Sequence, residues 1–142
     1  EHNQQYREWK LANPELNKKR ERKARLARKK KVNSDFDVFV QHKWSSQRGG
    51  AKKRGLSWSL TKEQVYTLFK TEKRCALTGL RVTHKIGDPF QASIDRIDNR
   101  YGYSLKNVQI VSARANSSRM ALTIKEWDKL CVSRAKQLGY TK

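Results

Sequence analysis

Hydrophobic residues recur at helical spacing behind two capping signals in the first part of the chain. Asn33-Ser34 is followed by apolar positions at Phe36, Phe39, Val40 and Trp44. Thr61 and Gln64 have the spacing of a capping box, and the apolar residues Val65, Leu68 and Phe69 follow them. The first pattern predicts a helix that begins after Ser34, and the second predicts a helix that ends near Thr71.

The stretches around these helices have a different pattern. Residues 45–55 (SSQRGGAKKRG) are rich in glycine and basic side chains, which predicts an exposed loop. Residues 56–60 alternate between apolar and polar positions and predict a short strand. Cys75–Gly79 predicts a tight turn into another short strand, and residues 83–90 predict an irregular loop.

The second half of the chain predicts a hairpin and two helices. Residues 92–97 alternate as a strand, Asn99–Gly102 supplies a turn, and the returning strand contains Val108, Ile110 and Val111. Residues 113–122 form a short helix that carries Asn116 and Arg119 on one side. Thr123 and Glu126 cap a last helix that ends at Gly139, with a predicted buried stripe of Trp127, Leu130, Cys131 and Leu138. The predicted fold class is α+β.

Charge separates residues 1–32, a basic N-terminal arm, from a domain over residues 33–142. Between Lys18 and Lys31 there are ten Lys or Arg residues and one acid, Glu21, and Asn13-Pro14 interrupts any helix before them. A segment with so few apolar residues cannot bury a face. Two interpretations remain open, a solvated and partly disordered tail or a helical arm that binds phosphates.

The whole chain has a formal net charge of +20, which indicates a polyanionic partner, above all nucleic acid. No apolar run approaches the roughly 20 residues that span a bilayer, and no stretch has a signal-peptide pattern, so we expect a cytoplasmic protein without a membrane partner. Cys75 and Cys131 are single and far apart, which predicts neither a disulfide framework nor a structural zinc site.

Asp95 and Asn116 are the residues with the most suggestive chemistry. A carboxylate from a strand and an amide oxygen from the following helix are donors that a hard divalent cation accepts, with phosphate oxygens and waters completing the shell. An Asp and an Asn at this separation carry little information by themselves, because buried and capping roles are more common.

The surrounding sequence is more specific. SIDRIDN, GYSLKNVQIVS and the Ala-Asn pair with Arg119 three residues later resemble the HNH or His-Me finger (ββα-metal) nucleases, in the branch common in bacteriophages. The resemblance covers about Cys75 to Arg119, a third of the chain. It implies a hairpin-and-helix metal finger over about residues 75–122 that packs with flanking helices. It also implies double-stranded DNA as substrate, and a phage-encoded enzyme acting in a bacterial host cell.

The resemblance also implies roles for single residues. Asp95 and Asn116 stand where the family holds one divalent metal ion, with Mg²⁺ expected and Mn²⁺ as the alternative. Asn107 matches the residue that braces the hairpin loop and orients the base. Arg96, however, stands where the family has its histidine general base, and an arginine cannot accept a proton near neutral pH. Arg96 can instead hold a phosphate oxygen.

The proton acceptor or nucleophile must then come from another element. His84 in the loop before the hairpin is the first candidate, Tyr103 after the turn is the second, and His42 is the third. Asp98 has two open roles, as an aid to the metal or as a cap of the turn, and the cap is favoured.

We expect basic residues in the arm, in the glycine-rich loop and beside the metal to contact phosphates. These are Lys18, Lys19, Arg20, Arg22, Lys23, Arg25, Arg28, Lys29, Lys30, Arg48, Lys52, Lys53, Arg54 and Arg119. The leading hypothesis is a metal-dependent DNA endonuclease. A non-catalytic DNA-binding protein on a degenerate HNH scaffold is the main alternative, and an RNA-associated protein is a third. One centre per chain predicts nicking by a monomer, and a homodimer if both strands are cut.

Overall fold

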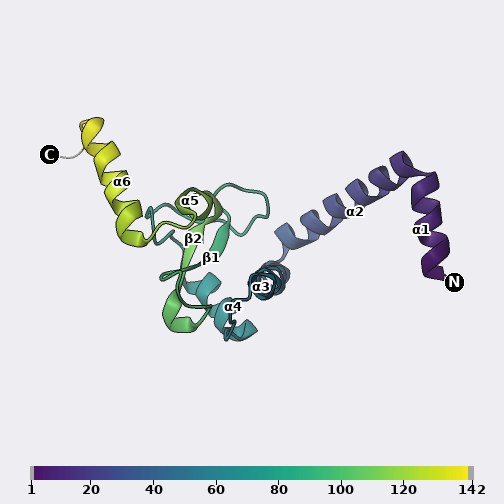
Figure 1. Cartoon of the computed structure of the whole chain (residues 1–142), viewed down its shortest axis with the longest axis horizontal. Helices are drawn as coiled ribbons and strands as arrows, with labels where there is room; N and C mark the ends of the chain where they lie inside the picture. Colours follow the sequence, from purple (N-terminus) through teal and green to yellow (C-terminus); the bar gives the residue numbers. More distant parts are fainter. Residues whose placement is uncertain (1, 141–142) are drawn as a thin grey trace.

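The computed structural model describes residues 2–140, with side chains from residue 3 onward, and has an α+β fold. In chain order its elements are α1 (His2–Ala12), α2 (Pro14–Ser34), α3 (Phe36–Lys53), α4 (Lys62–Thr71), β1 (Ala92–Arg96), the 3₁₀ turn η1 (Leu105–Asn107), β2 (Val108–Ser112), α5 (Ala113–Arg119) and α6 (Ile124–Gln137). The central body contains α3, α4, the hairpin and α5, while α1, α2 and α6 extend from it (Figure 1).

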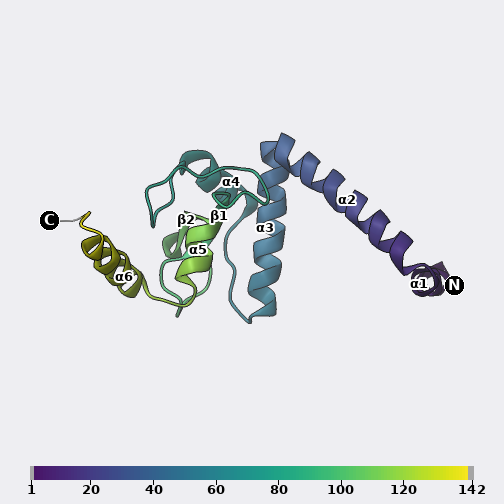
Figure 2. The ribbon, with the colours of Figure 1, turned by 90° about the horizontal axis from the view of Figure 1, so that it is seen from above.

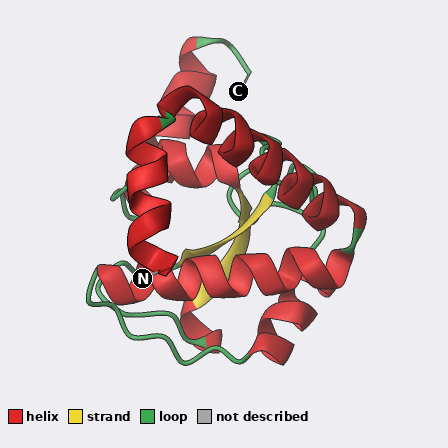
Figure 3. Cartoon of the chain, turned by 90° about the vertical axis from the view of Figure 1, so that its right-hand side faces the viewer, coloured by secondary structure: helices red, strands yellow, loops and turns green. Residues whose placement is uncertain are grey.

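The hairpin of β1 and β2 lies inside the body, where Figure 3 shows its two strands among helices. The strands are antiparallel, and Ile94 lies opposite Ile110 in the register. Both isoleucines belong to the buried core, together with Phe39 and Val40 of α3 and Val65 and Phe69 of α4. Burial of these side chains holds the hairpin against the two helices, because two strands alone are marginal in water.

Gln47 of α3 closes the free edge of β1. Its Nε2 donates to the Ile94 carbonyl oxygen at 2.9 Å, and its Oε1 accepts from the Ile94 backbone N–H at 3.4 Å. On the other edge, the Ala76 N–H donates to the Ile110 carbonyl oxygen at 2.9 Å. The backbone groups that a two-stranded sheet leaves open are thus satisfied by a side chain and by the turn after α4.

The helix α3 continues through Gly49 and Gly50, so the prediction of a loop over residues 45–55 is wrong. Each interior glycine costs a helix about 1 kcal/mol. Tertiary contacts offset that cost, since Gln47 is bonded to β1 and Ala51 is fully buried in the core. The helix ends at Lys53, and Gly55 then adopts a positive φ of 67°.

The start of α3 also differs from the prediction by one residue. Asp35 is the N-cap, and its side chain accepts hydrogen bonds from the N–H groups of Asp37 and Val38. Asn33 belongs to α2 and uses its side-chain oxygen for the Ile86 N–H at 2.7 Å. The two predicted capping boxes, Thr61 with Gln64 and Thr123 with Glu126, are both confirmed.

The predicted strand over residues 56–60 does not form. Trp58 makes a single parallel bridge with Tyr103, and a second isolated bridge joins Arg74 and Arg81 beyond the confirmed turn at Cys75–Gly79. The Trp58 ring lies 4.9 Å from the Tyr103 ring, between centroids. This ring packing and two backbone hydrogen bonds hold the segment in place: the Tyr103 N–H donates to the Ser57 carbonyl oxygen, and the Ser59 N–H donates to the Tyr103 carbonyl oxygen, both at 2.9 Å.

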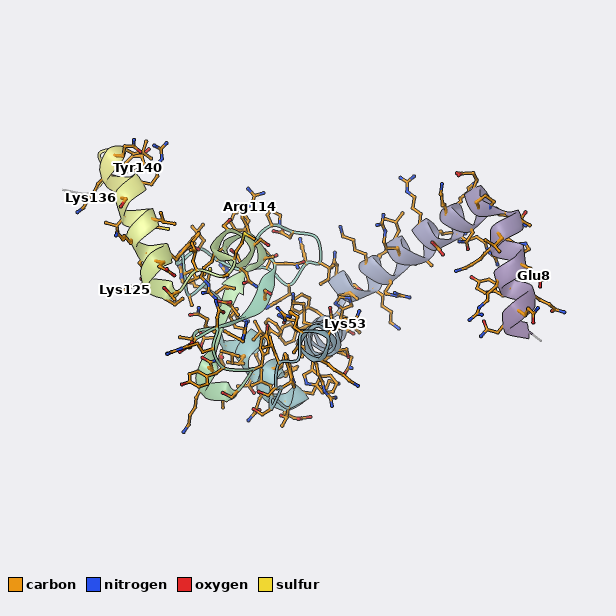
Figure 4. All side chains as sticks on the ribbon, viewed as in Figure 1. Glu8, Lys53, Arg114, Lys125, Lys136 and Tyr140 are labelled. Carbon is orange, nitrogen blue, oxygen red and sulfur yellow. The ribbon has the colours of Figure 1, made fainter. Side chains whose placement is uncertain are left out.

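The N-terminal arm is helical, with the predicted break at Asn13-Pro14 between α1 and α2. The 21 residues of α2 project from the body (Figure 2), and their long side chains spread into solvent (Figure 4). Only Val32, at the end of the helix, is buried in the core. At the far end, Lys10 of α1 pairs with Glu21 at 3.3 Å, and Arg20 lies over the Trp9 ring at 5.0 Å.

The prediction of a buried stripe on α6 is wrong. No residue of α6 is buried, because the helix leads away from the body and only its beginning lies beside the hairpin turn (Figures 1 and 2). Leu130 keeps 57% of its surface exposed, and Leu138 keeps 46%. Every helix within residues 2–140 is too short or too polar to cross a membrane.

Lys43 lies on the core-facing side of α3, where burial of its ammonium group destabilises the fold. Its surface is 7% exposed, and burial lowers its pKa to about 8. No ion pair within the described residues involves it. Because the unfolded chain binds this proton more tightly, the full penalty acts below pH 8 and disappears as the pH rises toward 10.5.

We therefore expect Lys43→Met to raise the free energy of unfolding at pH 7 by about 1–3 kcal/mol. Chemical denaturation at pH 7 measures this change. The control is Lys52→Met on the same helix, where the side chain is exposed and the expected effect is within about 0.5 kcal/mol. Destabilisation by Lys43→Met would show that the ammonium group has a favourable role in the fold.

Candidate functional site

Polar side chains occupy the face of the hairpin that α5 crosses. Ser93 and Asp95 alternate with the core residues of β1, and Gln109 is the register partner of Asp95 on β2. Asn116 of α5 lies at this face, with its Nδ2 3.5 Å from Ser93 Oγ. Arg119, one turn later on α5, reaches Asp95. The strand, the returning strand and the helix thus place Asp95 and Asn116 on one side of the hairpin.

Both carboxylate oxygens of Asp95 already accept hydrogen bonds. Oδ1 accepts from Arg119 Nη2 at 2.7 Å, and Oδ2 accepts from Gln109 Nε2 at 3.0 Å. The side chains of Arg119 and Asp95 are 1% and 7% exposed, so this is a buried ion pair. The prediction of Arg119 as a phosphate contact is therefore wrong, since a buried carboxylate requires a cation and Arg119 supplies it.

The guanidinium of Arg119 also binds the backbone at the end of β1 and just after α5. Nη2 donates to the Arg96 carbonyl oxygen at 3.0 Å, at the end of β1, and Nη1 donates to the Leu122 carbonyl oxygen, just before α6. Its buried Nε has no partner within the part of the chain that the structure describes. One side chain thus fixes the ends of the hairpin, of α5 and of the link to α6.

We expect Arg119→Leu to lower the free energy of unfolding by about 3–5 kcal/mol, because it leaves the Asp95 carboxylate buried and uncompensated. Denaturant titration followed by circular dichroism measures the loss. Arg114→Leu is the matched control, since Arg114 lies on the same helix but is exposed. Equal stability of the two variants would show that Asp95 does not need its partner.

A cavity of 660 Å³ opens beside this face and carries basic side chains. Its lining residues are Arg54, Arg96, Asn99, Asn116, Ser117, Met120 and Ala121. Arg96 Nη1 donates to the carbonyl oxygens of Asn99 and Tyr101 at 2.8 Å, which leaves its other N–H groups without partners within residues 2–140. Two arginines without a lining carboxylate suit a phosphate group.

The loop between the strands is held by Asn107. Its Nδ2 donates to the carbonyl oxygens of Asp98 and Gly102 at 3.0 and 2.9 Å, and its Oδ1 accepts from the Asp98 N–H at 2.9 Å. Asp98 caps the turn by accepting from the Arg100 N–H at 2.9 Å, as favoured from the sequence. Hydrogen bonds from Arg100 lower the pKa of Asp98 to about 2, so it stays ionised.

His84 lies away from this cavity. Its ring packs against Phe36, Phe39 and Phe69, with centroid distances of 4.8, 5.2 and 6.4 Å. These aromatic residues surround the beginning of α3, whereas Arg54 follows its end, and the backbones of Phe39 and Arg54 are about 20 Å apart along the helix. These hydrophobic contacts hold His84, the first predicted candidate for the general base, away from the cavity.

The other two predicted candidates for the proton acceptor, Tyr103 and His42, have different surroundings. Tyr103 is buried, and its hydroxyl accepts from Arg54 Nη2 at 3.1 Å, while the Arg96 guanidinium lies 5.6 Å from its ring centroid. Tyr103 therefore borders the cavity through two of its arginines. His42 lines a separate cavity against α2, and burial together with Lys43 and Arg28 lowers its pKa.

Burial, followed by the charge of Lys73, lowers the pKa of His84 below its ordinary value. The unfolded state then binds more protons than the folded state below about pH 6.5, so the free energy of unfolding falls as the pH drops through that range. We expect His84→Leu to make this fall shallower, as measured by urea titrations between pH 7 and pH 5. An unchanged dependence of stability on pH in the variant would contradict this structural role of His84.

The predicted phosphate-contacting residues other than Arg119 are exposed. Lys18, Lys19, Arg20, Arg22, Lys23, Arg25, Arg28, Lys29 and Lys30 lie on α2, and Arg48, Lys52, Lys53 and Arg54 lie on or directly after the second half of α3. Arg54 alone among them also lines the cavity with Asn116. The arm and the cavity are thus joined by one helix, α3.

Comparisons with known proteins add no assignment. No protein-family model matches the chain, and neither a curated protein nor a solved structure gives a significant match.

Several residues of this region escaped the sequence analysis. Gln109 is opposite Asp95, which the sequence could reveal only with the register of the hairpin known. Gln47 lies inside the stretch predicted as a loop, so no feature of the sequence indicated its contacts with Ser93 and Ile94. Asn99 was assigned to the turn, although it also lines the cavity and donates to the Ala121 carbonyl oxygen at 3.2 Å.

Proposed function

We propose that this protein is a divalent-metal-dependent DNA endonuclease that hydrolyses a phosphodiester bond at the cavity beside α5. The observation that carries the proposal is the placement of Asp95 and Asn116 on one face of the hairpin, next to a cavity that contains Arg54 and Arg96. The net charge of +20 and the exposed basic residues of α2 and α3 support a nucleic-acid substrate.

The side-chain oxygens of Asp95 and Asn116 are donor types that Mg²⁺ and Mn²⁺ bind. Asn116 lines the cavity, and its Oδ1 accepts no hydrogen bond within residues 2–140. Each oxygen of Asp95 keeps a lone pair beyond the hydrogen bonds from Arg119 and Gln109. The two residues would hold the ion, and it would neutralise charge on the scissile phosphate. The nearby Arg119 cation reduces the affinity, so we expect millimolar rather than micromolar metal to be required.

The protein's own groups would bind and orient the substrate. Arg96 and Arg54 face the cavity with positive charge and would hold the non-bridging phosphate oxygens. The carbonyl oxygens of Asn99 and Tyr101 fix the Arg96 guanidinium, so little freedom is lost when it meets a phosphate. An arginine at this position can bind negative charge but cannot act as the general base.

Tyr103 is the one predicted proton acceptor or nucleophile that contacts cavity residues. Its hydroxyl is bonded to Arg54, and its ring lies beside Arg96. We accordingly assign Tyr103, ahead of His84 and His42, as the residue that handles the proton or attacks the phosphate.

A second candidate is a DNA-binding protein without catalysis, on a hairpin that no longer binds metal. The buried pair of Asp95 with Arg119 favours it, because the cation occupies the carboxylate that a metal ion would use. The two candidates differ in the outcome with wild-type protein. An endonuclease nicks or linearises a plasmid with Mg²⁺ or Mn²⁺, whereas a binding protein retards the same DNA without cutting it.

Asn116→Ala is the sharpest test of the endonuclease proposal. Asn116 makes one long hydrogen bond, so its loss should shift the melting temperature by less than about 2 °C. We expect the rate of plasmid nicking to fall by at least about 100-fold, while DNA affinity changes by less than about threefold. Replacement of Asp95 would be less clear, because it leaves Arg119 buried without its partner.

Ser118→Ala is the control, since Ser118 is exposed on the same helix and does not line the cavity. It should cut at the wild-type rate. Unchanged cutting by Asn116→Ala would remove the metal site from the proposal. Absence of nicking by the wild-type protein with both metals would reject the enzyme and leave the DNA-binding candidate.

A further inference from the structure

The helix α6 carries an apolar stripe that nothing in the described chain covers. Trp127, Leu130, Cys131 and Leu138 recur at helical spacing along one side, and the last three are exposed. Figure 4 shows α6 extending from the body, with side chains such as Lys125, Lys136 and Tyr140 reaching into solvent. Exposed apolar residues gathered on one side of a helix are typical of a surface that meets another protein.

The beginning of α6 is fixed to the body. Arg119 donates to the Leu122 carbonyl oxygen, and Asn99 Nδ2 donates to the Ala121 carbonyl oxygen at 3.2 Å. The capping box of Thr123 and Glu126 then starts the helix. Because the origin of α6 is held by these contacts, its apolar stripe is already formed and presented before any partner binds.

The sequence of α6 is complementary to itself about Cys131. When two copies of the helix lie antiparallel around a two-fold axis at this residue, positions equally distant from it face each other. Ile124 then faces Leu138 and Trp127 faces Ala135, while Asp128 meets Arg134 twice. Glu126 likewise falls opposite Lys136, a second pair of opposite charges. No position in this arrangement opposes two like charges.

We propose that α6 is a homodimerisation helix, which pairs antiparallel with α6 of a second copy and places the two Cys131 residues at the two-fold axis. Charge complementarity identifies the occupant, since a parallel pair would set Asp128 against Asp128 and Arg134 against Arg134. The isologous contact closes after two copies, and it therefore gives a dimer rather than a filament.

The dimer should be weak when the protein is free. A helix of 14 residues is about 21 Å long, and one pair of such helices buries less than the roughly 1,000 Å² of a stable interface. Two chains of charge +20 also repel each other. Salt screens this repulsion over about 10 Å or less, and bound DNA neutralises it, so both should strengthen the dimer.

For catalysis, this inference rests on the proposed function. A dimer contains two cavities with Arg96 and Asn116, so it can cut both strands of a duplex, whereas a monomer nicks one strand. The self-association itself does not depend on any activity, and the two ideas can therefore fail separately.

The test compares Cys131→Asp with Ser133→Asp in the full chain. Both residues are exposed on α6, and both substitutions add one negative charge, but Ser133 lies on the side away from the stripe. In 0.3 M salt, sedimentation should show the wild-type protein and Ser133→Asp rising above 16.6 kDa with concentration. Cys131→Asp should remain monomeric, because two carboxylates meet at the axis.

Mild oxidation provides a second readout. The wild-type protein should form a disulfide-linked dimer that Cys131→Ser abolishes and Cys75→Ser does not, since Cys75 is buried. A wild-type protein that stays monomeric with and without DNA, or equal association of the two aspartate variants, would overturn the proposal. On plasmid, Cys131→Asp should nick at the wild-type rate but yield little linear DNA. Absence of all cutting alongside normal association would reject the proposed function alone.

Discussion

The ion pair of Arg119 and Asp95 is the interaction on which the arrangement of the second half of the chain depends. Arg119 neutralises the only buried carboxylate of the described residues, and the same guanidinium binds the backbone after β1 and before α6. The Arg119 side chain thus contacts the hairpin, α5 and the segment before α6. Arg119 also places a positive charge next to the Asp95 carboxylate, the group that would bind a metal ion in the proposed function.

The positive charges of this chain are held in two different ways. The lysines and arginines of α2 are exposed along a helix of about 31 Å and favour attraction to any polyanion. Arg54 and Arg96 are held in fixed positions by Tyr103 and by backbone carbonyl oxygens, so they are suited to one phosphate. In the proposed endonuclease, the arm would supply affinity and the cavity would position one phosphate.

Local signals in the sequence predicted the elements whose cause is local. The capping boxes at Thr61 and Thr123, the break at Asn13-Pro14 and the alternation of the hairpin strands are all present, because each depends on neighbouring residues. The pairing of Arg119 with Asp95 and the packing of His84 against three phenylalanines were missed, because both depend on how distant segments pack. Periodicity likewise shows that α6 has an apolar side, but not whether anything covers it.

The continuity of α3 through Gly49 and Gly50 has a geometric consequence for substrate binding. A loop at this place would leave the basic arm and the cavity free to vary in separation. A single helix of 18 residues, about 27 Å long, instead sets the distance between the N-cap Asp35 and the C-cap Arg54. On duplex DNA that length corresponds to roughly eight base pairs. The scissile phosphate would thus lie at a set offset from the stretch that the arm grips.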